Sequence, residues 1–400
     1  MGVKIGVVGC GSFSRSFINL FKAHPDVEKI VLCDLDPEKV KQRGAETGIE
    51  NFSGSLDHLL ETDVDAVALF TQNWLHGPQA KQALLNGKHV YSAVPMGITL
   101  DEIKDIVEAV EKTGNIYMMG ETSYYYPDVI YCRNKYQEGA FGDVVYTECE
   151  YYHDWDHGLY DVMKRRGGDN WKWTAGGPPM HYPTHSVSCF VSMTGAYLTK
   201  VSCQGFSDRN KDGYDLYGEG KNEWDNSFSN ESALFSASDG SAVRVNEFRR
   251  IGYPGTVRMS VFGTEGSFEN KSTESSKKGC SWMTKQQSER IVLDDLLECK
   301  PHAINNTDGE NAVVDEKPVN FAKIQPVDSL PDSFKKMNSG HFMSHNFLIH
   351  EFIQACYHRT MPCNNAWMAA RYTIPGIIAH ESAKRNGELL MIPDFGNPKY

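Results

Sequence analysis

The chain has 400 residues, of which 40% are hydrophobic, and its formal net charge at pH 7 is −12. This length predicts two or three domains, each with a hydrophobic core of its own. The acidic balance and the lack of a cluster rich in Lys and Arg argue against nucleic acid and anionic membranes as partners, and favour small-molecule chemistry.

The N-terminal residues carry the pattern of a dinucleotide-binding fold. An apolar run at residues 3–8 leads into a glycine turn, and a helical stretch follows. In such a turn the first glycine allows a tight bend, the second lets backbone N–H groups approach a pyrophosphate, and the helix N-terminus faces that charge. An ordinary strand, turn and helix without a nucleotide is the alternative. The residues expected to contact the cofactor here are Gly9, Gly11, Ser12, Phe13 and Ser14, the last at the usual place of a third glycine.

A second apolar run, residues 29–33, ends at Asp34. An acidic side chain at this place in the fold holds a ribose 2′-hydroxyl. Leu35 follows, rather than a basic residue that could pair with a 2′-phosphate. The pattern therefore favours NAD over NADP as the cofactor.

Further apolar runs at 64–70, 90–93 and 116–120 alternate with helical stretches. They predict a parallel, doubly wound sheet in a first domain, residues 1–122. Ligands bind at the carboxyl ends of such strands, so the polar residues there are candidates for cofactor binding. These candidates are Thr71, Asn73, His76, Val94, Pro95 and Glu121, although Pro95 could equally serve only to fix a turn.

Longer alternating runs begin at residue 144 and predict a mostly antiparallel sheet in a second domain, residues 123–400. The runs lie at 144–152, 201–206, 233–238, 242–248 and 256–263. Residues 269–335 are polar and irregular, which predicts surface loops, and helices are expected within 344–386. An open sheet usually buries its uncovered face against another subunit, so we expect a homodimer or a homotetramer.

Two imidazoles and a phenol cluster where a second-domain helix is expected to begin. His181, Tyr182 and His185 follow the rigid sequence Gly176-Gly177-Pro178-Pro179. Proton transfer needs groups whose pKa can lie near neutrality, and His and Tyr in a rigid turn meet that need. Each residue alone could equally have a structural role, but the cluster downstream of a nucleotide site indicates catalysis.

Other candidates carry weaker signals. The segment 153–157 reads His-Asp-Trp-Asp-His, whose residue types could bind a metal, but the spacing follows strand alternation, so we expect no metal site. Trp171 and Trp173 could stack on a sugar or pack in a core. Arg249 and Tyr253 could hold a substrate hydroxyl or carboxylate, with a solvated face as the alternative for the arginine.

The ten cysteines form no Cys-x-x-Cys pair, and no apolar run is long enough to cross a bilayer. The chain also starts in a predicted strand, without an apolar signal segment. These features predict a cytoplasmic protein with reduced thiols.

Taken together, the motifs resemble the Gfo/Idh/MocA family of nicotinamide-dependent sugar enzymes over almost the whole chain. The residues that carry the resemblance are the Gly9-x-Gly11 turn, Asp34, Thr71-x-Asn73-x-x-His76, the Pro95 turn, Gly139-Ala140-Phe141-Gly142 and the helix with His185. The resemblance implies a Rossmann domain followed by an open-faced sheet domain, with hydride transfer between a sugar or cyclitol carbon and NAD(P). The dehydrogenase branch has Glu-Lys-Pro where this chain has Ala93-Val94-Pro95, and an Asp where it has His181, so its usual relay is not expected.

The NAD-dependent glycosidase branch, which includes α-N-acetylgalactosaminidases, is a closer match. That branch has Val-Pro and a Tyr-Pro-Thr-His stretch, here Tyr182-Pro183-Thr184-His185, and positions like Glu121, His153-Asp154, Tyr253 and Gly340-His341. The resemblance implies redox-neutral cleavage: oxidation at carbon 3, loss of the carbon 1 group, water addition and return of the hydride.

The implied roles are proton transfer at carbon 2 by Tyr182 or His185, orientation of the reacting hydroxyl by Glu121 and His181, and a leaving-group or substrate contact by Tyr253. Substrate binding would involve Trp171, Trp173, Arg249 and His341. Two alternatives stay open: a net sugar dehydrogenase, and a sugar sensor that binds NAD without catalysis, which Val94 in place of the lysine would favour.

Overall fold

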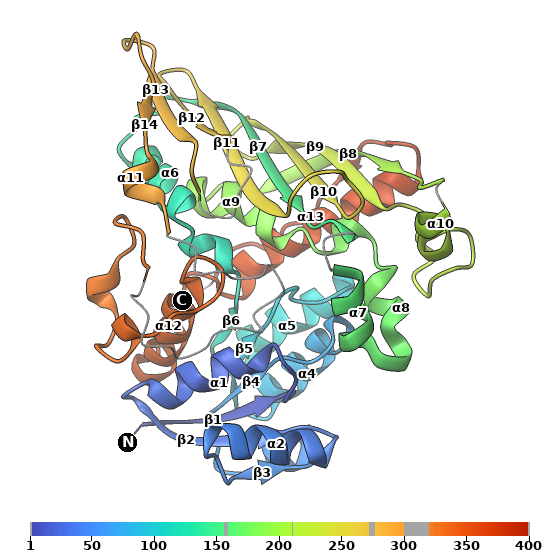
Figure 1. The fold of residues 1–400 in the computed structure, drawn as a ribbon, viewed down its shortest axis with the longest axis vertical. Coiled ribbons are helices and arrows are strands. Elements are labelled where there is room, and N and C mark those ends of the chain that lie inside the picture. Colours follow the sequence, from blue (N-terminus) through green and yellow to red (C-terminus); the bar gives the residue numbers. More distant parts are fainter. Residues whose placement is uncertain (1, 156–158, 210, 272–276, 300–319, 399–400) are drawn as a thin grey trace.

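The computed structural model describes residues 2–155, 159–209, 211–271, 277–299 and 320–398. They form two sheets, one in each half of the molecule, with helices between and around them (Figure 1). The predicted fold class, a Rossmann sheet followed by a mostly antiparallel sheet, is confirmed.

The first sheet is parallel throughout and has the strand order β3-β2-β1-β4-β5-β6. Its direction of winding reverses between β1 and β4, which creates a crevice at the carboxyl ends of these strands. The strands are β1 (Val3–Val8), β2 (Val27–Cys33), β3 (Phe52–Ser53), β4 (Ala66–Leu69), β5 (His89–Ser92) and β6 (Tyr117–Met119).

Helices cover both faces of this sheet, so its central strands are buried throughout. Side chains alternate between the faces: Val67 packs in a core with α4 and α5, whereas Ala68 packs in a core with α1. The helices are α1 (Ser14–Ala23), α2 (Pro37–Thr47), α3 (Leu56–Leu60), α4 (Asn73–Leu85) and α5 (Leu100–Thr113).

The second sheet has nine strands in the order β14-β13-β12-β11-β7-β10-β9-β8-β15. Only the pairing of β7 with β10 is parallel among the described strands. The strands are β7 (Val144–Tyr152), β8 (Leu198–Phe206), β9 (Asn230–Ala237), β10 (Ala242–Phe248), β11 (Thr256–Gly263), β12 (Gly266–Asn270), β13 (Cys280–Thr284), β14 (Ile291–Val292) and β15 (Leu390–Met391).

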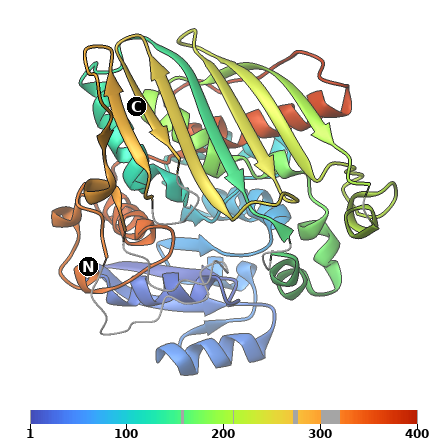
Figure 2. The same cartoon turned by 45° about the horizontal axis from the view of Figure 1, so that its top comes forward.

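One face of the second sheet is covered by helices, and the other is bare over the described part of the chain (Figure 2). Helix α9 (Thr184–Thr194) lies under the sheet with α13 (Ala366–Lys384), and residues 184–193 are all buried. The other helices of this half are α6 (Pro127–Gln137), α7 (Leu159–Gly167), α8 (Trp171–Ala175), α10 (Lys211–Tyr217) and α11 (Asp294–Leu297).

Two expectations about the later part of the chain differ from the structure. Residues 269–335 were expected to be surface loops, but β13, β14 and α11 lie within them, because Cys280, Trp282 and Leu297 bury their side chains in the main core. Helix α12 (Ser344–His358), expected in the second domain, instead packs its Phe347 and Phe352 against α1 and the first sheet. The chain therefore returns to the Rossmann layer.

No helix among the described residues is long and apolar enough to cross a membrane. All ten cysteines lie in described segments and are free thiols, and nine of them are buried. Buried free cysteines behave as small apolar side chains, which is their role in this fold.

Candidate active site

A cavity of about 930 Å³ lies between the carboxyl ends of the first sheet and the inner side of the second sheet. Of the cofactor residues predicted from the sequence, those that line it are Gly9, Gly11, Ser12, Phe13, Asp34, Thr71, Asn73, His76 and Val94. Ser14, Pro95 and Glu121 do not line it. The cavity therefore has the position that the doubly wound sheet predicts.

The glycine turn after β1 is shaped to admit an anionic ligand. Gly9 has φ +96°, and a Cβ there would meet the Phe70 carbonyl oxygen at 2.7 Å, so only glycine fits. A Cβ on Gly11 would meet no protein atom, which leaves space on the cavity side. Helix α1 has no side-chain cap at its N-terminus, so its first N–H groups are available to a phosphate. Ser14 supports the turn instead of contacting the ligand, since its Oγ donates to the Gly11 carbonyl at 3.0 Å.

Asp34 is held rigidly at the end of β2. Its carboxylate accepts the Cys10 N–H at 2.8 Å and the Asp36 N–H at 3.0 Å, and it still lines the cavity. A carboxylate has further lone pairs, so it can also accept hydrogen bonds from ribose hydroxyls. Leu35 is 84% exposed and offers no charge to a 2′-phosphate. The described residues of this end of the cavity therefore fit NAD.

His76 joins two of the strand-end turns. Its Nδ1 lies 2.8 Å from the Pro95 carbonyl oxygen and its Nε2 lies 3.1 Å from the Thr71 carbonyl oxygen. Burial lowers the pKa of His76, so the ring is neutral and donates to one of the two carbonyls at a time. Pro95 thus shapes the cavity through His76 rather than lining it.

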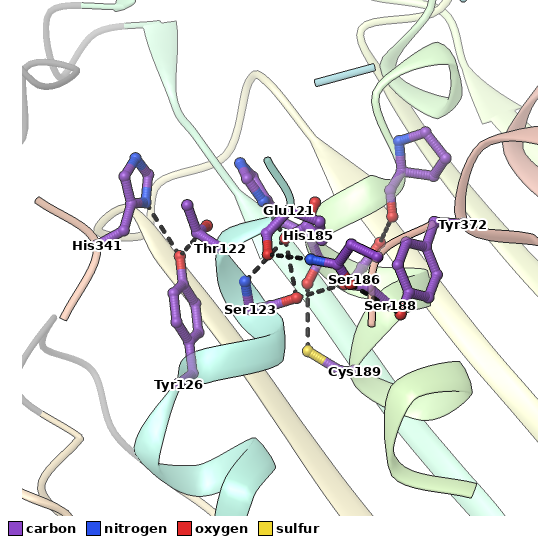
Figure 3. A network of polar contacts seen from close by, with 12 residues as sticks. Glu121, Thr122, Ser123, Tyr126, His185, Ser186, Ser188, Cys189, His341 and Tyr372 are labelled. Carbon is purple, nitrogen blue, oxygen red and sulfur yellow. Dashed lines mark hydrogen bonds and ion pairs between the residues drawn. The ribbon is translucent and has the colours of Figure 1, made fainter. Parts of the chain in front are cut away.

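The central feature of the site is a buried pair formed by His185 and Glu121 (Figure 3). His185 lies in the first turn of α9, and its Nδ1 donates to Glu121 Oε1 at 2.8 Å. The Ser123 N–H and hydroxyl donate to the same oxygen, each at 2.9 Å. Burial disfavours both charges, but the attraction between them outweighs it: the pKa of Glu121 lies below its ordinary value and the pKa of His185 above it. The pair is an imidazolium and a carboxylate.

Glu121 was expected to contact the cofactor and to orient the reacting hydroxyl, and the structure corrects this. Its side chain is fully buried and is not part of the cavity wall, whereas His185 lines the cavity. Glu121 therefore reaches the cavity only through its hydrogen bond with His185. The sequence could not show this order, because both residue types suit direct contact.

Replacing Glu121 by glutamine should move the pH dependence of turnover. The carboxylate raises the pKa of His185, so its loss lowers that pKa, and activity that needs the imidazolium then disappears at a lower pH. We expect the alkaline limb of the kcat profile to shift to lower pH, with turnover at neutral pH at least ~10-fold lower and partly restored on acidification.

The matched control for this variant is Glu381→Gln, which removes a partly exposed carboxylate paired with Lys384 on α13. It should leave the profile unchanged. An unshifted alkaline limb in Glu121→Gln would show that Glu121 does not set the protonation of His185.

The second-domain wall of the cavity carries Tyr182 beside this pair. Its ring is 5.4 Å from the His185 ring and 6.2 Å from the Tyr151 ring. Arg249, which is 8% exposed, lies with its guanidinium 4.9 Å from the centre of the Tyr151 ring and donates to Glu247 at 3.0 Å. A phenol, an imidazolium and a guanidinium therefore face the same space.

His181 and His341 complete the set of imidazoles in the wall. The buried Nδ1 of His181 has no hydrogen-bond partner in the described chain, and burial with the nearby His380 lowers its pKa well below the ordinary value. Nδ1 of His341 lies 3.0 Å from the Tyr126 hydroxyl, and its ring is 5.6 Å from that of His185. A neutral imidazole, such as that of His181, both donates and accepts hydrogen bonds.

Two further candidates, Tyr253 and Trp171, are not brought to the cavity. Tyr253, predicted to contact substrate, lies in the connection between β10 and β11, where its hydroxyl accepts from Arg258 at 3.2 Å. Trp171 packs in a small satellite core and lies 5.7 Å from the Lys164 ammonium, so the core-packing interpretation holds for it. The side chain of Trp173 lies outside the described residues.

The segment 153–157 is only partly described, since Asp156 and His157 lie outside the described residues. Nδ1 of His153 lies 2.6 Å from the Tyr151 hydroxyl, and Asp154 accepts the Ile251 N–H at 2.8 Å. Among the described residues no group of three His, Cys, Asp or Glu side chains could hold a metal ion.

Sequence reasoning missed several residues of the wall. They are Tyr151, His153 as a wall residue, Leu159, Trp224 and His345. Most carry no local signal, because strand alternation or a loop position brings them to the cavity. His345 does carry a local signal in the sequence. It stands four residues after His341, a spacing that in a helix would place both rings on one face.

Comparisons with known proteins match both halves of the chain. The sequence model of the Gfo/Idh/MocA family described as "Oxidoreductase family, NAD-binding Rossmann fold" matches residues 3–121. The model described as "GFO/IDH/MocA C-terminal domain" matches residues 129–269.

Three curated relatives have informative names. A "Glycosyl hydrolase family 109 protein" of Shewanella amazonensis is 29% identical over 197 residues, covering 46% of this chain and 43% of that protein. One of Streptomyces niveus is 25% identical over 419 residues, covering 98% and 77%. The 2,7-anhydro-N-acetylneuraminate hydratase of Escherichia coli K12 is 28% identical over 204 residues, covering 51% and 52%. The chain thus spans about half the length of the Shewanella and Escherichia relatives.

Solved structures share the fold over the whole chain. Levoglucosan dehydrogenase in complex with NADH and levoglucosan matches with a TM-score of 0.72 and 16% identity, covering 99% of this chain and 100% of that chain. Apo scyllo-inositol dehydrogenase of Lactobacillus casei matches with a TM-score of 0.70 and 17% identity, covering 98% of each chain.

Proposed function

Because the chain belongs to the Gfo/Idh/MocA family of NAD-binding oxidoreductases, we propose that it is an NAD-dependent glycoside hydrolase whose reaction has no net oxidation. The observation that carries the proposal is the imidazolium of His185, paired with buried Glu121 and placed beside Tyr182 in the cavity that the dinucleotide turn also lines. The relatives named glycosyl hydrolase family 109 support the same class of reaction.

NAD would be held by the first-domain end of the cavity, through Asp34, Gly11 and the uncapped N-terminus of α1. When bound, it supplies an acceptor for the hydride at carbon 3 of the sugar and returns that hydride at the end of the cycle. Formation of the carbon 3 ketone also releases the proton of its hydroxyl, and the ketone acidifies the proton at carbon 2, so the protein must manage both protons and the charge that develops on the oxygen.

The described side chains divide these tasks. Glu121 raises the pKa of His185 and so favours its imidazolium, which suits stabilisation of the negative oxygen that forms when the carbon 2 proton leaves. Tyr182 lies beside it and, as the phenolate, can take that proton on its oxygen and become the neutral phenol. The carbon 1 group then leaves with the electron pair of its bond and takes up a proton. Water adds to the unsaturated ketone, its oxygen to carbon 1 and a proton to carbon 2, and return of the hydride and a proton to the carbon 3 ketone gives the free sugar.

Substrate hydroxyls would be bound by Arg249, His181 and His341, which carry donors and acceptors in the same wall. Arg249 keeps its charge at all accessible pH values, whereas His181 is neutral, so beside the His185–Glu121 pair the wall offers a substrate an ionic contact at Arg249 and a neutral one at His181. This composition suits an uncharged or singly anionic sugar.

A net sugar dehydrogenase is the second candidate, because levoglucosan dehydrogenase shares the fold. The two differ in the fate of the cofactor: a hydrolase needs NAD only in catalytic amounts, whereas a dehydrogenase consumes one NAD per turnover. A protein that only senses sugar would turn over no NAD, in catalytic or in stoichiometric amounts. The charged pair beside the cavity argues against such a sensor.

The test is to incubate the purified protein with aryl α- and β-glycosides in deuterated water, with NAD below the substrate concentration. Three quantities are followed together: aglycone release, NADH absorbance and deuterium at carbon 2. We expect release beyond the amount of NAD, deuterium in the product and no accumulation of NADH. NADH formed in proportion to substrate without release would establish the dehydrogenase, and no reaction with any glycoside would favour the sensor.

We also propose that the chain forms a homodimer or a homotetramer through the bare face of the second sheet. Leu234 and Phe206 on this face are 55% and 57% exposed, and Arg244 is 2.8 Å from Glu150, which also pairs with Arg258. Sedimentation velocity tests this, and a single species of 44.9 kDa at micromolar concentration would contradict it.

A further inference from the structure

His345 is a fully buried residue of the cavity that the proposed reaction does not use. It is the second residue of α12, its exposed fraction is 0%, and it lines the cavity. Neither of its ring nitrogens has a hydrogen-bond partner within the described chain. Two unpaired polar atoms in a buried position are costly, so a group that enters the cavity and pairs with them would bind favourably.

The position of His345 relates it to the cofactor. Its ring lies 4.3 Å from the ring of Phe17 in α1 and 6.4 Å from the ring of Phe13 in the phosphate turn. On its other side the ring of His341 is 5.1 Å away, and His341 in turn neighbours His185. His345 thus stands between the phosphate turn and the reacting end of the cavity. In NAD, the part that extends from the pyrophosphate toward the reacting end is the nicotinamide riboside, so His345 lies where this part of the cofactor would bind.

The backbone before α12 is unusual in the same place. His341, Phe342 and Met343 have φ values of +53°, +55° and +68°, a left-handed conformation that side chains other than glycine rarely adopt. Such conformations persist where the surrounding structure enforces them and gather at ligand sites. Here they direct α12 so that its first turn reaches the cavity.

The protonation state of His345 fits an amide ligand. Burial, with the nearby His341 and His185, lowers the pKa of His345 well below its ordinary value, so the ring is neutral. A neutral imidazole has one N–H donor and one nitrogen acceptor. The nicotinamide carboxamide has N–H donors and a carbonyl acceptor, so it can pair with either ring nitrogen.

We propose that His345 is a cofactor-binding residue that hydrogen-bonds the carboxamide of the nicotinamide ring. The proposal rests on NAD binding and not on the proposed hydrolase reaction. It predicts that His345 discriminates between NAD and ADP-ribose, which has the same adenosine, pyrophosphate and ribose but lacks the nicotinamide.

The test is isothermal titration calorimetry of the full chain with NAD and, separately, with ADP-ribose. We expect His345→Phe, which fills the site without polar atoms, to weaken NAD binding ~10-fold, because it removes a hydrogen bond made in a dry site. ADP-ribose affinity should change less than about 2-fold, and His345→Asn, which keeps a donor and an acceptor, should retain part of the NAD affinity. The control is His358→Asn, an exposed position at the end of the same helix.

Two outcomes would overturn the assignment: unchanged NAD affinity in His345→Phe, or an equal loss of affinity for both ligands, which indicates a disturbed pocket. If the phenylalanine variant does not fold, nuclear magnetic resonance on the wild-type chain with ¹⁵N-labelled histidine decides. The spectrum of His345→Asn assigns the signal, because the one signal of the 14 histidines that is missing in this variant belongs to His345. Its ring nitrogens should shift with NAD and not with ADP-ribose, and equal shifts with both would contradict the proposal.

Discussion

Replacement of His185 by alanine is expected to lower turnover at least ~100-fold, with NAD affinity changed much less. His185 lies at the cavity wall, and in the proposed reaction its loss removes the positive charge that stabilises the oxygen of the oxidised carbon. Preorganised charge of this kind acts in the transition state more than in substrate binding, so kcat should fall more than KM rises. Steady-state kinetics with the aryl glycoside that the protein cleaves fastest measures kcat and KM.

This substitution also leaves the buried carboxylate of Glu121 without its partner, which costs about 3–5 kcal/mol of folding stability. The double variant His185→Gln with Glu121→Gln removes both charges, so it should recover most of the thermal stability while turnover stays low. His358→Ala, at an exposed position, is the matched control for loss of an imidazole. Recovery of turnover together with stability in the double variant would show that His185 has only a structural role.

The fold was predictable from sequence because its signals are local. The glycine turn before Ser14, the acidic residue at the end of β2 and the alternating runs of the second sheet each follow from neighbours along the chain. The runs 144–152, 242–248 and 256–263 coincide with β7, β10 and β11. Here the hydrophobic pattern and the strand geometry agree.

Long-range packing explains what the sequence did not show. Helix α12 carries buried side chains on several sides, among them Phe347 and Ile353, so its pattern does not say which domain it covers. The short strands β13 and β14 are held by a neighbouring strand and not by a strong pattern of their own. Both features depend on partners far away in the sequence.

The candidate site was predictable as a list of residues and less so as an arrangement. His181, Tyr182 and His185 share one turn, and the structure keeps them together at the cavity. The residue types of Glu121 and Tyr253 both suit direct contact, but burial puts the first behind His185, and the second lies in the connection between β10 and β11, beside Arg258. A sequence gives the chemistry of a side chain, whereas its side of a sheet depends on register.

Replacement of Tyr182 by phenylalanine should also lower turnover at least ~100-fold, because in the proposed reaction it removes the group that moves the carbon 2 proton, while it keeps the ring that packs near His185. The oxidation at carbon 3 does not need that proton transfer, so deuterium incorporation at carbon 2 should be lost while NADH absorbance still appears on mixing with substrate. Rapid mixing in deuterated water followed by analysis of the recovered sugar measures both.

Tyr357→Phe is the matched control, because this residue of α12 is 47% exposed and its hydroxyl should not affect either signal. The separation of the two signals is the informative part of the experiment. A variant that merely disturbs the cavity would lose NADH formation and exchange together, since both depend on a correctly held sugar. Near-normal exchange in Tyr182→Phe would instead remove the tyrosine from proton transfer.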